Sequence, residues 1–196
     1  SVTQNRKLPV ALHVILISFA LLGLIYSAVI PIFEASDEVW HYPMVWHIAR
    51  TWTLPVQPLE PGAPSGPWRQ EASQPPLYYA IGAALTAWID TSGLEQIRHL
   101  NPHVAAGEVR ADRSNPNLVV HNPALERFPW RGTVLAVHIV RAFSVLLGTW
   151  AVYLTWALVR ELFPDRPKLA LITAAIHAFT PMSLFINASV NNDNLI

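Results

Sequence analysis

The sequence predicts an all-α integral membrane protein, in which three transmembrane helices carry a large outer loop bearing interfacial helices. Of the 196 residues, 52% are hydrophobic and only 13% are charged, which is about half the charged share of a soluble domain. Three long runs lack any formal charge, namely residues 8–33, 142–159 and 169–192. A helix needs about 20 apolar residues to cross the hydrocarbon layer. Each run can therefore form one span, provided that the second helix extends by about one turn into the flanking residues.

Charge balance and cysteine content exclude several other classes. Thirteen basic residues balance thirteen acidic ones, and the net charge is zero. A nucleic-acid partner held by a basic face is therefore not expected. The sequence contains no cysteine, which rules out disulfide scaffolds, zinc–thiolate sites and thiol nucleophiles.

The spans divide the chain into six segments. In order they are a cytoplasmic N-terminus with the first transmembrane helix (1–33), a first extracytoplasmic loop with interfacial helices (34–133), a second transmembrane helix (134–162), a cytoplasmic turn (163–168), a third transmembrane helix (169–190) and the start of a second outer loop (191–196). Two basic residues precede the first span, and the short connection 160–168 has a net charge of +1; short flanks with excess positive charge stay in the cytoplasm. We therefore expect a multi-pass protein of the cell membrane with its long loop outside.

The first part of the outer loop predicts a helix. Ser36 is a suitable N-cap, and Asp37 and Glu38 suit the first turn, where acidic side chains are favourable. An apolar residue then recurs at every fourth position: Trp40, Met44, Ile48 and Trp52. This stripe predicts a helix that lies along the membrane surface and that Pro43 kinks or restarts.

The rest of the loop is less regular. Residues 57–67 are spaced by prolines and predict an extended linker. Residues 77–89 are apolar but too short to span, so we expect a re-entrant or interfacial segment. Residues 94–130 show no periodicity and predict no regular element.

The predicted topology gathers polar residues from distant parts of the chain at one outer face. They are Glu34, Asp37, Glu38, His41, Arg141, Asn192 and Asp193. A carboxylate at this boundary can take a proton from an acceptor, and a membrane arginine can hold a phosphate with two hydrogen bonds. The set indicates a lipid-phosphate substrate with its tail in the bilayer. A sugar transferred from it would leave a lipid phosphate, so no general acid would be needed, in contrast to glycoside hydrolysis.

Structural alternatives stay open for each candidate. Asp37 and Glu38 could cap a helix, and Arg141 could reach outward to the headgroups. His41 could join Asp37 and Glu34 as a metal ligand, because positions i, i+3 and i+7 share one helical face, or it could be an ordinary polar histidine.

Four segments together resemble a known family. They are residues 34–42, 54–55, 74–79 and 141–148. Their order resembles the N-terminal part of the GT-C membrane glycosyltransferases, in particular the branch similar to protein mannosyltransferases and aminoarabinose transferases. In that family an acidic pair follows the first span, a Pro-Pro-Leu-Tyr element lies in the first outer loop, and an arginine opens the second span. Asn192 and Asp193 resemble a family motif at the outer end of the third span, although they could also only cap a helix.

The resemblance implies an inverting transfer of a sugar from a polyprenyl-phosphate donor to an extracytoplasmic acceptor, and it identifies this chain as an N-terminal fragment. It implies Asp37 as the catalytic general base, with Glu38 as the second acid. The implied substrate-binding residues are Arg141, His41, Gln74, Tyr78, Asn192 and Asp193. Gln74 stands where many relatives have a lysine near the donor phosphate. No metal ligand is assigned, and a divalent metal is the one cofactor left open.

Two other functions compete with this interpretation. Charged residues within spans mark substrate paths in transporters and channels, so the chain could be a fragment of one, or a non-catalytic membrane protein. A transporter is expected to hold its acids near the bilayer midplane, whereas the acids here lie just outside the first span.

Overall fold

The structure is a computed structural model that describes residues 8–35, 37–58, 66–104 and 117–195. Across these residues it is helical, and the one extended pairing is an isolated bridge between Leu100 and Val119. The elements in chain order are α1 (Val10–Val29), α2 (Glu38–Thr51), the 3-10 helix η1 (Arg69–Ser73), α3 (Leu77–Thr86), α4 (Leu94–Ile97), α5 (Pro123–Glu126), α6 (Gly132–Leu162), α7 (Pro167–Phe179), α8 (Pro181–Asn187) and the 3-10 helix η2 (Asn192–Leu195).

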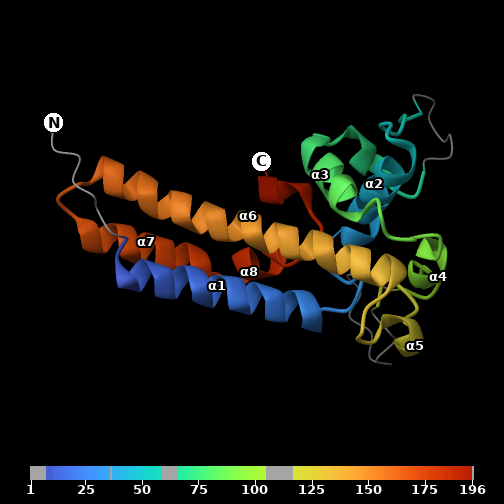
Figure 1. Cartoon of the computed structure of the whole chain (residues 1–196), viewed down its shortest axis with the longest axis horizontal. Helices are drawn as coiled ribbons and strands as arrows, with labels where there is room; N and C mark the ends of the chain where they lie inside the picture. Colours follow the sequence, from blue (N-terminus) through green and yellow to red (C-terminus); the bar gives the residue numbers. More distant parts are fainter. Residues whose placement is uncertain (1–7, 36, 59–65, 105–116, 196) are drawn as a thin grey trace.

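Two of these helices, α1 and α6, are long and apolar enough to cross a membrane. They lie side by side with α7 in one elongated bundle, whereas α2 to α5 gather at one end of α6 (Figure 1). The outward faces of both long helices are apolar, with exposed residues such as Ile17, Leu21, Leu146 and Leu154. Such faces suit lipid rather than water. The expected all-helical protein with membrane-length helices is therefore confirmed.

The third expected span, residues 169–190, is a bent pair of helices. The axes of α7 and α8 differ by 62°, so the pair is either one broken span or a re-entrant loop. Pro181 explains the break, because it has no N–H to donate to the carbonyl of His177, four residues earlier. The start of α1 and the connection between α6 and α7 lie at the same end of the bundle, as the predicted topology requires (Figure 1).

Helix α2 starts one residue later than its sequence pattern indicated. Asp37 holds the N-cap position in a left-handed conformation (φ 55°), and Glu38 is the first helical residue. Asp and Asn adopt this conformation more readily than most residues. Ser36, the expected cap, lies outside the described residues.

Pro43 does not restart α2, which continues through it to Thr51. A proline leaves the carbonyl four residues earlier without its helical partner, and here that carbonyl belongs to Val39. The guanidinium of Arg98 supplies the missing donor, with Nε 2.9 Å from the Val39 oxygen. Arg98 is buried, and it also donates to the carbonyl of Pro67. A side chain from another part of the loop thus replaces the backbone donor that Pro43 lacks.

Replacing Arg98 by Met is expected to lower the free energy of unfolding by about 2 kcal/mol, because it leaves the buried Val39 carbonyl without a donor. The loss should shrink in a Pro43→Ala background, since an alanine at position 43 supplies the backbone N–H. Denaturation in mixed micelles, followed by tryptophan fluorescence, measures both values. Arg50→Met is the matched control, because Arg50 is exposed and lies over the Trp46 ring. Equal losses in the two backgrounds would show that Arg98 does not compensate for the missing N–H of Pro43.

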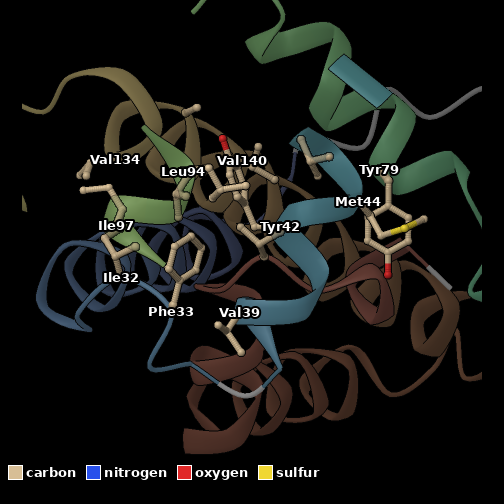
Figure 2. Packing of buried hydrophobic residues seen from close by; sticks show 14 of the residues in the cluster. Ile32, Phe33, Val39, Tyr42, Met44, Tyr79, Leu94, Ile97, Val134 and Val140 are labelled. Carbon is tan, nitrogen blue, oxygen red and sulfur yellow. The ribbon is translucent and has the colours of Figure 1, made fainter. Parts of the chain in front are cut away.

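The apolar stripe of α2 faces the protein. Met44 and Ile48 are buried in the main core, together with residues of the α1–α2 connection, α3, α4 and the first turns of α6 (Figure 2). Trp52, the last member of the stripe, ends the helix and is exposed. The middle of the stripe is therefore part of the protein core, where α2 packs mainly against α3, rather than forming the membrane-facing side that the pattern predicted.

The loop after α3 has more structure than expected. Between residues 94 and 130 it contains α4, α5 and the bridge between Leu100 and Val119, and residues 105–116 lie outside the described part. Glu34 anchors this loop, because its carboxylate accepts hydrogen bonds from the amides of Leu118 and Val119. These are long-range contacts, which periodicity within the loop does not reveal.

Candidate functional site

A buried ion pair lies where the loop meets the bundle. Arg141 of α6 is fully buried, and its Nε donates to the Glu38 carboxylate at 2.8 Å. Its Nη2 contacts the other oxygen of the same carboxylate. The remaining N–H groups donate to the carbonyls of Ser27, Ile30 and Pro31 at 2.7–3.0 Å. The last carbonyls of a helix have no partner within it, and Arg141 thus caps the end of α1.

Glu38 is satisfied just as completely. Besides Arg141, its carboxylate accepts from the amides of Phe33 and Val190, both at 2.9 Å. The pair therefore joins the α1–α2 connection, α6 and the segment after α8. Every N–H of the Arg141 guanidinium meets a protein acceptor within the described residues. The expected roles of Arg141 at a donor phosphate and of Glu38 as a second acid gain no support from this geometry.

Asp37 lies next to Glu38 in sequence but in a different environment. Its side chain is exposed, and its carbonyl starts α2 by accepting from the amides of Trp40 and His41. Two adjacent acids thus differ completely in burial. The left-handed backbone of Asp37 turns the chain between them, and the Glu38–Arg141 pair fixes that turn.

Behind Asp37, three elements bring polar side chains together. The Nδ1 of His41 (α2) is 2.7 Å from the hydroxyl of Tyr79 (α3) and 3.5 Å from the carboxylate of Glu71 (η1). All three side chains are buried. Asp37 and Asp193 lie close enough to change the pKa of both His41 and Glu71. We call Asp37, His41, Glu71, Tyr79 and Asp193 the outer acidic cluster.

Burial controls the protonation of this cluster. Burial lowers the pKa of His41, although the charges of Asp37, Asp193 and Glu38 oppose this effect. Burial raises the pKa of Glu71, and the charges of Asp37 and Asp193 raise it further. The two effects favour neutral side chains behind two exposed carboxylates.

The opposite directions of these two pKa shifts predict opposite pH effects on stability. At His41 the unfolded chain binds more protons than the folded one below pH 6.5, so acidification favours unfolding. At Glu71 the folded chain binds more protons just above the ordinary carboxyl pKa of 4.5, so ionisation as the pH rises is destabilising. We expect the His41→Gln variant to lose less stability than the wild-type protein when the pH falls from about 7 to 5. We expect Glu71→Gln to increase stability relative to the wild-type protein, with the largest increase near neutral pH. Melting temperatures over this range test both slopes. The exposed His99, changed to Gln, is the matched control, and slopes that move in the same direction would contradict the assignment.

The remaining predicted residues divide into two groups. Asn192 donates through Nδ2 to the Gln74 side chain at 3.4 Å, so these two meet beside Asp193. Tyr78 is buried instead, with its hydroxyl 2.6 Å from the Ser144 hydroxyl and accepting from the Asn191 amide. Tyr78 therefore ties α3 to α6 and to the C-terminal segment.

The structure does not bring Glu34 together with Asp37 and His41, as the metal-site alternative requires. Because α2 begins only at Glu38, Glu34 does not share a helical face with Asp37 and His41. Its carboxylate instead lies 3.0 Å from the Nε2 of His121. In the part of the chain that the structure describes, no group of three or more His, Asp or Glu side chains is arranged to hold a metal ion.

Sequence reasoning missed three residues near the site. Glu71 and Tyr79 surround His41 in the outer acidic cluster, and Arg69 of η1 lies with its guanidinium 3.5 Å from the centre of the Trp40 ring. Tyr79 belongs to the Pro-Pro-Leu-Tyr-Tyr element and could have been found there. Glu71 and Arg69 follow the proline-spaced linker, where no periodicity indicates which way a side chain points.

Comparisons with known proteins do not place the chain in a family. No family model, no curated protein and no solved structure matches it.

Proposed function

We propose that this chain is part of a membrane glycosyltransferase that moves a sugar, with inversion, from a polyprenyl-phosphate donor to an extracytoplasmic acceptor. One observation carries the proposal. Asp37 is exposed at the end of a membrane-length helix bundle, while its neighbour Glu38 is buried against Arg141. An exposed carboxylate on a fixed backbone is what a general base at the membrane boundary requires.

The chemistry needs one base and a good leaving group. The acceptor hydroxyl attacks the anomeric carbon from the face opposite the phosphate, and its proton passes to the Asp37 carboxylate. The new C–O bond forms as the bond from the anomeric carbon to the phosphate oxygen breaks. The bonding pair leaves with the polyprenyl phosphate, which is stable as an anion and needs no general acid.

The arrangement supports preorganisation of the base. Glu38 receives hydrogen bonds from Phe33, Arg141 and Val190, and this anchor fixes the backbone one residue away from Asp37. A base held in place before the substrate arrives avoids the cost of reorganisation in the transition state. Asp193 and the buried His41 lie beside it and are suited to bind sugar or acceptor hydroxyls.

Arg69 is the proposed partner of the donor phosphate. Its guanidinium lies over the Trp40 ring and has no hydrogen bond or ion pair within the described residues. It belongs to η1, directly before the Pro-Pro-Leu-Tyr element, and thus close in sequence to Gln74, where the resembling family has a lysine. Arg69 offers a positive charge that the neutral Gln74 cannot supply. Arg141 is not available for this role, because its guanidinium is paired with Glu38.

The test is turnover of polyprenyl-phosphate sugars by the intact protein in lipid nanodiscs. We expect release of polyprenyl phosphate, measured by mass spectrometry, and an inverted anomeric centre in the product, measured by NMR. Arg69→Gln should raise the donor KM more than it lowers kcat. Lys168→Gln, which removes an exposed cation at the opposite end of the bundle, is the control. Movement of intact substrate across the membrane without bond cleavage would instead favour the transporter alternative.

A further inference from the structure

A pocket lies at the N-terminal end of α6, outside the outer acidic cluster. Its volume is about 510 Å³, and residues of α4, α5 and the first turn of α6 line it, none of which belongs to the cluster. Small-molecule sites range from about 300 to 1,000 Å³. The pocket is thus large enough for a compact organic ligand.

The start of α6 presents unsatisfied donors to this pocket. Gly132, Thr133 and Val134 form the first turn, where amides have no partner within the helix. The N-cap residue Arg131 gives no side-chain cap, and the first turn contains no acid. No backbone hydrogen bond uses these three amides within the described residues. The positive end of the helix dipole therefore faces the pocket without compensation.

The side chain of Thr133 supplies an independent indication of a ligand. Thr133 lines the pocket and is only 4% exposed. Its Oγ1 has no hydrogen-bond partner in the part of the chain that the structure describes. A buried hydroxyl without a partner is destabilising, so a ligand that accepts its hydrogen bond would relieve this cost.

The charges at the rim indicate the sign of that ligand. Arg127 and Arg131 are exposed, line the pocket, and have no side-chain partner among the described residues. Asp90 is the acid in the wall, and its carboxylate already accepts from the Ser92 amide at 2.9 Å. The balance of charge in the pocket is thus positive.

Packing in the bundle fixes the depth of this site. A methyl group added to Gly23 of α1 would lie 2.9 Å from Val145 of α6, so these two positions are level. Counting outward from them at roughly 1.5 Å per residue, Thr133 lies about 9 Å beyond the level of Val29, the last residue of α1. With α1 as a membrane span, Thr133 would lie at or beyond the headgroup layer, within reach of water.

We propose that this pocket binds the phosphate group of a phosphate ester. The first amides of α6 and the Thr133 hydroxyl donate to the phosphate oxygens, and Arg127 and Arg131 balance its charge. Apolar side chains, among them Leu125, contact the organic part. The phosphate can come from a soluble phosphomonoester or from a lipid headgroup, because both present anionic non-bridging oxygens to these donors.

Titration calorimetry on the intact protein in zwitterionic nanodiscs, with inorganic phosphate and with phenyl phosphate, tests the site directly. We expect phenyl phosphate to bind more tightly than inorganic phosphate, since only it reaches the apolar wall. Arg131→Gln and Arg127→Gln should each weaken binding at least about tenfold, the value of a charged hydrogen bond. Lys168→Gln, at the far end of the bundle, should leave binding unchanged. Nanodiscs that contain phosphatidylglycerol provide the second arm: competition by this lipid against phenyl phosphate identifies a headgroup as the source.

Thr133→Val separates a binding role from a structural one. The substitution keeps the shape and removes the unpaired hydroxyl, so the ligand-free protein should melt at a higher temperature while phosphate binds several-fold more weakly. A purely structural threonine would not give these opposite changes. Absence of phosphate-ester binding in both kinds of nanodisc, or binding that these variants leave unchanged, would overturn the proposal. Neither outcome bears on sugar transfer at Asp37, because the pocket and the outer acidic cluster share no residue.

Discussion

Asp37→Asn is expected to lower sugar transfer by about two to four orders of magnitude, the usual contribution of a general base. The substitution removes the basic carboxylate and changes little else, because asparagine also adopts the left-handed conformation that position 37 requires. Asparagine is an equally good N-cap residue, so α2 should still begin at Glu38. The measurement is single-turnover transfer from a radiolabelled polyprenyl-phosphate sugar by the intact protein in nanodiscs.

The control for this experiment is Asp165→Asn, which removes an exposed carboxylate from the turn between α6 and α7, at the opposite end of the bundle. It should transfer sugar at the wild-type rate. A melting temperature for Asp37→Asn within a few degrees of wild type would show that the loss is chemical. Transfer by a well-folded Asp37→Asn protein at the wild-type rate would remove Asp37 from the role of base.

Glu38→Gln is expected to lower the free energy of unfolding by about 3–5 kcal/mol, the cost of breaking a buried ion pair on one side. Arg141 is fully buried, and without the carboxylate its charge remains in the protein uncompensated. Arg141→Met should cost a similar amount, because it leaves the Glu38 charge buried and removes the donor from three carbonyls around the end of α1. Denaturation in mixed micelles measures both, and the eight tryptophans supply the signal.

The double variant makes this prediction specific. When both partners are replaced, no unpaired charge remains, so the loss should be smaller than the sum of the two single losses. The matched control is Glu95→Gln, which removes an exposed carboxylate 3.8 Å from Arg98 and should cost less than about 0.5 kcal/mol. Additive losses for Glu38 and Arg141, or a loss at Glu38 no larger than at Glu95, would contradict the anchoring role of the pair.

The two predictions are linked through the backbone. If Glu38 anchors the turn that presents Asp37, then Glu38→Gln should lower stability and should also reduce transfer by the protein that remains folded. Asp37→Asn should lower the rate without lowering stability. This contrast distinguishes a base from a positioning residue.

Some features of this protein follow from the amino-acid sequence by itself. A run of uncharged, apolar residues can satisfy its backbone in lipid only as a helix, so the helices α1 and α6 could be predicted from composition alone. The break at Pro181 also has a purely local cause, because the missing N–H is a property of the residue. The presence of acids at the start of α2 was also predictable, since they follow directly on a membrane-length run. Local covalent chemistry and hydropathy decide all of these features.

Other features were decided only by the tertiary structure. The sequence cannot show that Arg141 meets a carboxylate 103 residues away, that Arg98 repairs the helix at Pro43, or that Thr133 keeps an unpaired hydroxyl. Each depends on which helix faces are in contact, and several packings of the same apolar stripes satisfy the pattern equally well. Hydropathy therefore determined that the chain forms helices long and apolar enough to cross a membrane, with acids at one end. The packing of α2 and α6 determined which of those acids is buried in an ion pair and which remains exposed, because only contact between distant segments removes a charge from water.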